Sequence, residues 1–437
     1  MKKANLITNT PLTKKIARRL TSVMASLLLG TSSSLLWADS ATDTKVIGYI
    51  ASFTDMKAAI DKTDLSRLTH INLSFTNPDA EGKLVKDGVM TCMPGRSAGN
   101  VSADDVRYVI DKAQAAGVKV LASVAGGVIP ACSGNWETLL KPENRDSLVA
   151  NLISFMEEFG LDGIDVDIEG AVLTSIDNAG NYTPFIQALS EQLVERGKLL
   201  TCATASYVGG MIPVSSIPYF DFVNIMSYDA IGPSWGQAGA EHSTYDMAVE
   251  HVNIWKERGL SKEKLVLGVP FYGYGFGTYN SDYTYATILA NFGSEAAERD
   301  LIGTACAGCN YITYNGAATI KAKTRLALAE GSGVMIWELS QDATGANSLL
   351  KVIHDEIQQA DNSSSESSSS ESISSESTIS SAAPVSSAPE SSAAASSAPA
   401  VKGDKSSGGG SLGLWSIFSL LILVIARAAF AKCPARR

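Results

Sequence analysis

Three acidic residues alternate with apolar residues in the segment Asp-Gly-Ile-Asp-Val-Asp-Ile-Glu at residues 162–169. Because successive side chains of a β-strand point to opposite faces, Asp165, Asp167 and Glu169 share one face. In a sheet that is covered on both sides, such acids point into the interior rather than to solvent. Close carboxyl groups do not all ionise, so we expect a shared proton and a raised pKa at the outermost acid, Glu169. A carboxyl group that stays protonated near neutral pH is suited to general acid catalysis.

Eight short apolar segments, each followed by an amphipathic stretch, lie between the two ends of the chain. This alternation predicts an α/β fold, a (β/α)8 TIM barrel with parallel strands and crossover helices. A doubly wound open sheet is the alternative, but no glycine-rich phosphate turn follows the first segment. In a barrel, Glu169 would lie at the C-terminal end of the strands, where active sites are found. The predicted strands are residues 46–50, 70–75, 118–124, 163–168, 199–205, 222–226, 265–270 and 333–339.

Capping residues predict the bounds of three crossover helices. We expect them to run from Ser102 to Gly117, from Asn144 or Asp146 to Gly160, and from Thr183 and Pro184 to Gly197. After the seventh strand, residues 273–277 read Gly-Tyr-Gly-Phe-Gly, which predicts a flexible loop rather than a dinucleotide-binding turn.

The acidic segment at residues 162–169 resembles the signature of glycoside hydrolase family 18, the chitinases and endo-β-N-acetylglucosaminidases. The similarity covers about residues 45–357. The other segments that resemble this family are Gly48-Tyr49, Thr69-His70-Ile71-Asn72, Met226-Ser227-Tyr228-Asp229, Leu267-Gly268-Val269-Pro270-Phe271-Tyr272-Gly273 and Gly333-Val334-Met335-Ile336-Trp337.

The sequence departs from the family pattern at three positions and in one loop. Ala125 stands where the family has the first glycine of a Ser-x-Gly-Gly pattern, and Ile168 and Gly170 replace aromatic residues found beside the acid in many relatives. Residues 274–311 are short for the α+β insertion of many relatives. We therefore expect a short loop insertion after the seventh strand and an open cleft.

The resemblance implies a retaining, substrate-assisted mechanism, which is established for this family. Glu169 would protonate the glycosidic oxygen while the 2-acetamido carbonyl of the substrate attacks the anomeric carbon. Asp167 would stabilise the oxazolinium ion, and Asp165 would hold the shared proton when Asp167 turns away. Tyr228 would orient the acetamido oxygen, with Asp229 beside it.

Aromatic side chains near the strand ends are candidates for stacking on sugar rings. Trp337, at the end of the eighth strand, is expected to form the floor of the cleaved subsite, although it could instead fill the core. Trp235, in a loop after the sixth strand, is a candidate for the acceptor side. Tyr49 and Met226 are expected at the substrate, with a core position as the alternative.

Charge and cysteine content limit the partners and the compartment. Residues 39–361 hold 23 basic and 40 acidic side chains, a net charge of −17 that disfavours nucleic acid as a partner. Two disulfides, Cys92 with Cys132 and Cys306 with Cys309, are expected in an oxidising compartment, and Cys202 is expected as a buried thiol. The four histidines lack metal-binding spacing, so we expect structural roles for them and neither a metal nor an organic cofactor.

Both ends of the chain have the composition of targeting segments. We expect a signal peptide at residues 1–38, a catalytic barrel at residues 39–361 and a disordered Ser/Ala/Pro-rich linker at residues 362–406. Residues 407–437 combine glycines, a short apolar run and a basic end, which resembles a GlyGly-type sorting signal cut by a rhomboid-like protease. A plain membrane anchor is the alternative. Either arrangement predicts a secreted or cell-surface protein whose C-terminal segment enters the membrane at least transiently.

Three functions fit these residues. The first is hydrolysis of β-1,4 linkages in chitin or other N-acetylglucosamine-containing oligosaccharides. The second is an endo-β-N-acetylglucosaminidase acting on N-glycans, which would share every catalytic residue. The third is a catalytically silent, lectin-like chitin-binding protein, which the presence of Glu169 argues against.

Overall fold

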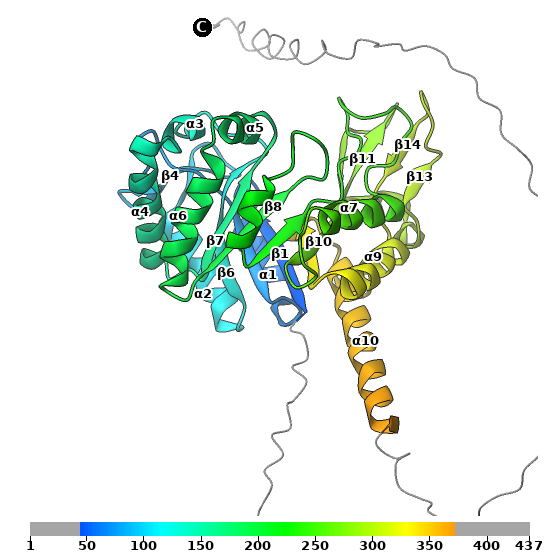
Figure 1. Cartoon of the computed structure of the whole chain (residues 1–437). Coiled ribbons are helices and arrows are strands. Elements are labelled where there is room, and N and C mark those ends of the chain that lie inside the picture. The colour runs from blue at the N-terminus through cyan, green and yellow to red at the C-terminus, as the bar shows by residue number, and fades with distance from the viewer. Residues whose placement is uncertain (1–43, 372–437) are drawn as a thin grey trace, which may run out of the picture. The chain divides into compact units, whose positions relative to one another are not determined.

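A closed barrel of eight parallel strands forms the centre of the fold (Figure 1). The computed structural model describes residues 44–371, with side-chain surroundings to residue 363. The barrel confirms the predicted (β/α)8 fold, and the alternative of an open doubly wound sheet is wrong. In their order around the barrel the strands are β1 (Lys45–Ala51), β15 (Gly333–Trp337), β10 (Leu265–Pro270), β9 (Phe222–Ile225), β8 (Leu199–Thr204), β7 (Gly163–Ile168), β6 (Lys119–Gly126) and β2 (His70–Thr76).

Helices surround the barrel strands, and their starts follow local capping chemistry. The Ser102 hydroxyl accepts a hydrogen bond from the Asp105 N–H, which confirms this predicted cap. One helix begins before the predicted Asn144, because Pro142 occupies its first turn, where a missing N–H is tolerated. The helices are α1 (Met56–Lys62), α2 (Ala103–Ala115), α3 (Trp136–Leu139), α4 (Pro142–Glu158), α5 (Gly170–Asn178), α6 (Tyr182–Val194), α7 (Tyr245–Glu257), α9 (Ala317–Glu330) and α10 (Leu349–Glu371).

The segment after β10 is a folded α+β unit and not the predicted short loop. Strands β11 (Tyr272–Phe276), β12 (Asp282–Thr284), β13 (Leu301–Gly303) and β14 (Tyr311–Thr313) form an antiparallel sheet with helix α8 (Tyr285–Phe292) (Figure 1). The expected flexible Gly-Tyr-Gly-Phe-Gly loop is largely β11. A Cβ atom at Gly273 or Gly275 would collide with neighbouring backbone, so these glycines permit close strand packing.

A second small sheet follows β2. It consists of β3 (Val85–Lys86), β4 (Val89–Pro94) and β5 (Asn100–Ser102). The Cys92–Cys132 disulfide joins β4 to the segment after β6, and Cys306 pairs with Cys309. Both pairings confirm the prediction, and Cys202 is a buried free thiol as expected.

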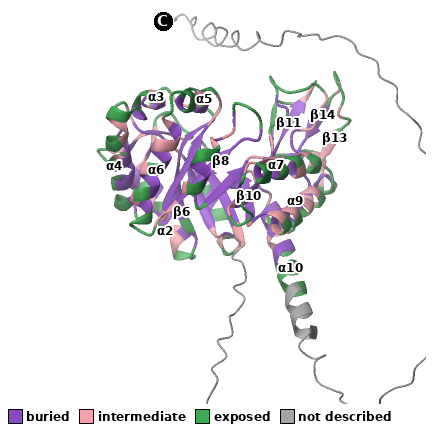
Figure 2. Ribbon diagram, in the orientation of Figure 1, coloured by how far each residue is buried: buried purple, intermediate pink, exposed green. Residues whose placement is uncertain are grey.

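Buried residues are concentrated in the barrel strands and on the helix faces that meet them (Figure 2). A large apolar cluster fills the space between strands and helices. A separate, smaller cluster in the barrel contains Ile47, Tyr49, Phe222, Val266 and Met335. Polar side chains share the barrel strands with this inner cluster, and the acids of β7 are among them.

Helix α10 continues to Glu371, through the first ten residues of the segment expected to be a disordered linker. Extending an existing helix adds one hydrogen bond for each residue fixed, which explains why the Ser-rich sequence remains helical here. Within residues 44–371, no helix is long and apolar enough to cross a membrane. The predicted signal peptide and the sorting signal or anchor lie outside the described residues.

Candidate active site

Asp165, on β7, lies at the centre of a buried hydrogen-bond network. Its carboxylate accepts hydrogen bonds from the hydroxyl groups of Tyr49 at 2.7 Å, Ser123 at 2.7 Å and Thr201 at 2.5 Å. The strand register explains two of these contacts, because Ser123 on β6 and Thr201 on β8 both pair with Asp165. Burial raises the pKa of Asp165, and the three donors oppose that rise. Asp165 is therefore fixed in place by neutral donors.

Tyr49 lies deeper than the sequence predicted. It is only 1% exposed and belongs to the inner barrel cluster, so it presents almost no surface to a sugar. The expectation that Tyr49 contacts substrate is corrected, since its hydroxyl donates to Asp165. The alternation of faces along a strand identifies an inward side chain but does not reveal its depth in the barrel.

Asp167 is buried next to Asp165 and has a free acceptor position. Its side chain is 2% exposed, and its Oδ1 atom has no hydrogen-bond partner among the described residues. The pKa of Asp167 is raised well above its ordinary range, first by burial and then by the charges of Glu169 and Asp165. A buried oxygen without a partner is suited to bind a donor from a ligand.

Glu169 follows β7 at the N-terminus of α5 and has a pKa near neutrality. Burial is the largest cause of the rise from 4.5 to about 7, and the charge of Asp229 adds to it. The group thus remains largely protonated up to neutral pH, as the sequence predicted. A Cβ atom at Gly127 would lie 2.8 Å from Glu169 Oε1, so a glycine leaves room for this carboxyl group.

Strand β6 contains a residue in a strained conformation near its C-terminal end. Ala125 has φ +74°, in the left-handed region that favours glycine. Its carbonyl oxygen accepts a hydrogen bond from Asn77 Nδ2 at 3.0 Å. The departure from the family pattern is therefore accommodated by the local structure.

Trp337 ends β15 and forms an aromatic group with two neighbours. Its ring is partly exposed, stacks on Phe75 with centroids 5.5 Å apart and contacts Tyr49 at 5.4 Å. Met226 is also partly exposed and packs against the inner cluster. Trp337 and Met226 thus combine core contacts with an open face.

Asp229 is surrounded by residues from the loop after β9 and from the insertion. Tyr272 donates a hydrogen bond to its carboxylate, and Trp235 Nε1 donates to its backbone carbonyl at 3.0 Å. Trp235 is 46% exposed, as a platform for a ligand would be. Burial is the largest cause of the raised pKa of Tyr228, followed by the charges of Asp167, Asp229 and Glu169.

Several contributors to this site were not among the predicted site residues. Ser123 and Thr201 support Asp165, and they were missed because their role depends on strand register. Tyr272, which donates to Asp229, belongs to a segment that already resembled the family. Tyr274 and His242 also lie near Asp229, and they were missed because they come from the insertion and from a long loop. The glycine alternation in β11 was the one signal that a strand follows the seventh barrel strand.

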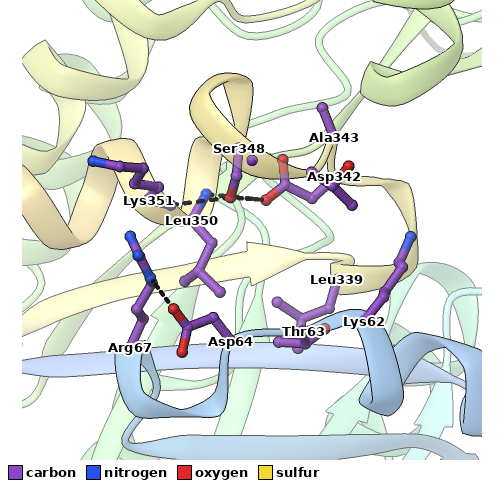
Figure 3. Close-up of a pocket in the computed structure, with 12 residues that line it drawn as sticks. Lys62, Thr63, Asp64, Arg67, Leu339, Asp342, Ala343, Ser348, Leu350 and Lys351 are labelled. Carbon is purple, nitrogen blue, oxygen red and sulfur yellow. Dashed lines mark hydrogen bonds and ion pairs between the residues drawn. The ribbon is translucent and has the colours of Figure 1, made fainter.

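A separate cavity of about 170 Å³ lies between α1 and the start of α10 (Figure 3). Its charged residues include Lys62, Arg67, Lys351 and Asp342, and none of the β7 acids lines it. Arg67 pairs with Asp64 at 2.6 Å, and Asp342 accepts hydrogen bonds at the start of α10. Both contacts are local, one within residues 64–67 and the other within residues 342–350, and the candidate site remains at β7. Within the described residues, no group of three or more His, Cys, Asp or Glu side chains is arranged to hold a metal ion.

Comparisons with known proteins agree with this geometry. Residues 45–342 match the family model described as glycosyl hydrolases family 18. The crystal structure of the GH18 chitinase ChiB from the chitin utilization locus of Flavobacterium johnsoniae is 36% identical, with a TM-score of 0.62, over 73% of this chain and 95% of that one. A chitinase from Bacteroides thetaiotaomicron is 30% identical, with a TM-score of 0.60, over 72% and 96%.

A curated relative, probable chitinase 10 of Drosophila melanogaster, is 26% identical over 299 residues. The match covers 55% of this chain but 13% of that much longer protein. The closed eight-stranded barrel agrees with these matches. The chain belongs to glycosyl hydrolase family 18, and its described domain is that of a chitinase-type glycosidase.

Proposed function

We propose that the protein hydrolyses β-1,4 linkages between N-acetylglucosamine units of chitin or chitin oligosaccharides, with retention of anomeric configuration. The observation that carries this proposal is the pair formed by Glu169, whose pKa is about 7, and Asp167, whose buried Oδ1 lacks a partner among the described residues. The first is suited to donate a proton near neutral pH, and the second is suited to accept a hydrogen bond from a substrate N–H.

In the first step, Glu169 donates its proton to the glycosidic oxygen as the bond to the anomeric carbon breaks. The carbonyl oxygen of the substrate's 2-acetamido group attacks that carbon and forms an oxazolinium ion. Asp167 accepts a hydrogen bond from the acetamido N–H, and its negative charge stabilises the positive ring. Tyr228 donates its hydroxyl proton toward the acetamido oxygen and orients it.

In the second step, the Glu169 carboxylate removes a proton from water, which attacks the anomeric carbon from the face that the leaving group vacated. The acetamido group is restored, and two inversions give net retention. Asp165 and Asp167 share one proton, and Asp165 holds it when the Asp167 side chain turns away. The three hydroxyl donors around Asp165 support this role because they keep its position fixed.

Binding of the oligosaccharide is proposed to use Trp337, Met226, Trp235 and Asp229. The partly exposed ring of Trp337 supports stacking at the cleaved subsite, and the exposed ring of Trp235 supports a second platform. No cofactor takes part in this mechanism.

Product analysis tests the proposal with wild-type protein, Glu169→Gln and the matched exposed control Glu81→Gln. Wild type and the control should release short oligomers from chitin hexamer and insoluble chitin. Glu169→Gln should lose activity by about 10²- to 10⁴-fold while it still binds the hexamer, because an amide does not deliver a proton. Wild-type turnover by Glu169→Gln would reject the assignment.

Two further substrates separate the remaining alternatives. Cleavage of a high-mannose glycopeptide in preference to chitin hexamer would favour the endo-β-N-acetylglucosaminidase, and hexamer binding without hydrolysis would favour a lectin-like protein. A branched glycan needs a wide cleft, and the open cleft expected from a short loop is no longer supported because the insertion is a folded sheet. Cleavage of fully de-acetylated chitosan as fast as chitin would contradict the role of the acetamido group.

Export is proposed from the ends of the chain, and the Cys92–Cys132 disulfide supports an oxidising compartment. If residues 407–437 form a sorting signal, mature protein from its host should end near residues 408–410. Intact-mass analysis distinguishes this product from a chain that continues to Arg437. A chain that continues to Arg437 would identify a plain membrane anchor and would rule out cleavage by the proposed processing protease.

A further inference from the structure

His242 is a buried histidine beside the site, in the loop between β9 and α7. Its side chain is 0% exposed, and neither ring nitrogen has a hydrogen-bond partner among the described residues. The imidazole ring contacts the rings of Tyr272 at 5.2 Å and Tyr274 at 5.4 Å, both on β11. Its Nδ1 atom lies 3.8 Å from Asp229 Oδ1. The nearby carboxylate is thus an acceptor just beyond hydrogen-bond distance.

The backbone of His242 is fixed on two sides. Its N–H donates to Thr313 Oγ1 at 3.1 Å, and its carbonyl oxygen accepts from the Ala230 N–H at 3.0 Å. The second bond links His242 to the residue that follows Asp229. The histidine therefore connects the insertion to the loop that carries this carboxylate.

Asp229 has a backbone conformation that requires support. Its φ of +65° lies in the left-handed region, which is unfavourable for a residue other than glycine. Its carboxylate receives a hydrogen bond from Tyr272, and its side chain is 41% exposed. Among the described residues it forms no ion pair with Lys or Arg, and the imidazole of His242 is the nearest basic group, 3.8 Å away. An aspartate without a cationic partner keeps its full electrostatic effect on neighbouring acids.

We propose that His242 is a positioning residue that donates Nδ1–H to Asp229 and holds this carboxylate in its position within the site. The inference rests on the proposed function, because the orientation of Asp229 matters through the protonation of the catalytic acid. No atom is transferred in this contact, since the imidazole stays neutral and its proton remains bonded to Nδ1 while the carboxylate oxygen accepts the hydrogen bond.

The groups that face His242 favour a neutral ring. They are Asp229 on its own loop, Tyr272 and Tyr274 on β11, and Lys323 on α9. Burial lowers the pKa of His242 most, and the charge of Lys323 lowers it further against the opposing effect of Asp229. The Lys323 amine is itself bound by Ser243 and Asn315, and burial lowers the pKa of this lysine to about 7. A neutral imidazole leaves the charge of Asp229 uncompensated.

The test compares His242→Phe, which keeps a ring but loses the donor, with His242→Asn, which keeps a donor near the position of Nδ1. His251→Phe, a partly buried histidine of α7, is the matched control. In His242→Phe the Asp229 carboxylate turns toward solvent, the repulsion on Glu169 weakens and the pKa of Glu169 falls. The alkaline limb of kcat/KM for chitin hexamer should then move to lower pH by at least about half a unit. His242→Asn should restore most of the shift, and His251→Phe should match wild type.

A second measurement does not depend on hydrolysis. Side-chain nitrogen NMR of the intact protein, with the His242 signal assigned by its loss in His242→Phe, should show a neutral Nδ1–H tautomer at pH 7. Superimposable pH profiles of wild type and His242→Phe would overturn the inference, and so would a charged or Nε2–H ring. Failure of the proposed function is distinct, because a wild-type protein that hydrolyses no chitin oligomer still gives the NMR result.

Discussion

Replacing Glu169 with glutamine should change how the stability of the protein depends on pH. The pKa of Glu169 rises from 4.5 to about 7, mainly through burial. Between these values the folded protein binds the proton more tightly than the unfolded chain does, so the free energy of unfolding falls as pH increases. This stabilising contribution is complete below pH 4.5 and is lost as the pH rises through about 7.

The size of the effect follows from the pKa difference. A shift from 4.5 to about 7, at 1.36 kcal/mol for each unit, corresponds to about 3 kcal/mol of stability lost by wild type above pH 7. Glutamine has nearly the same shape and carries no charge at any pH, so the free energy of unfolding of the variant does not fall in this way above pH 7. A buried carboxyl group that lowers stability above neutral pH is expected at an active site, where activity can require a destabilising residue.

Urea unfolding at pH 4, 6 and 8 measures the difference for wild type, Glu169→Gln and the exposed control Glu81→Gln. At pH 4, Glu169→Gln should have about the stability of wild type, and at pH 8 it should be more stable by about 3 kcal/mol. The control should follow wild type throughout. A constant difference between wild type and Glu169→Gln from pH 4 to pH 8 would refute a raised pKa at this position.

Three further changes test other parts of the site and the fold. Gly127→Ala places a methyl group 2.8 Å from Glu169 Oε1. It should lower kcat/KM for chitin hexamer by about 10- to 100-fold with little change in stability. Unchanged kinetics would show that the Glu169 side chain shifts without loss of function. Trp337→Ala should weaken hexamer binding by about 1 to 3 kcal/mol in calorimetry, and equal affinity in a folded variant would place the ring in the core. Replacing Cys92 and Cys132 with serine removes a disulfide between residues 40 apart in the sequence and should lower the free energy of unfolding by about 2 to 4 kcal/mol. An unchanged denaturation curve would show that this disulfide does not stabilise the fold.

The sequence predicted the barrel and β7 because both depend on local patterns. Alternation of acids with β-branched residues predicted the bounds of β7, Gly163–Ile168, without error. Eight apolar runs with helical spacers predicted the barrel for the same reason. The start of α4 was displaced because two polar residues looked like better caps than the Lys141-Pro142 pair that the structure uses.

Contacts between segments that lie far apart in the chain could not be predicted from the sequence. Ser123 and Thr201 reach Asp165 through strand register, which a single strand does not encode. The environment of Asp229 depends on an insertion that was interpreted as a loop, because glycines that permit close strand contact look the same in a sequence as glycines that permit flexibility. Tyr49 was expected at the substrate, with the core as the alternative, and its burial in the core depends on how the barrel closes.

In the proposed mechanism, the substrate's own acetamido group acts as the nucleophile while Glu169 serves as both acid and base. Proton NMR of the first products released from chitin hexamer measures the anomeric configuration before mutarotation. We predict that the new reducing ends appear in the β configuration, with the α form arising only later by equilibration. Products released first in the α configuration would show inversion and would contradict the mechanism.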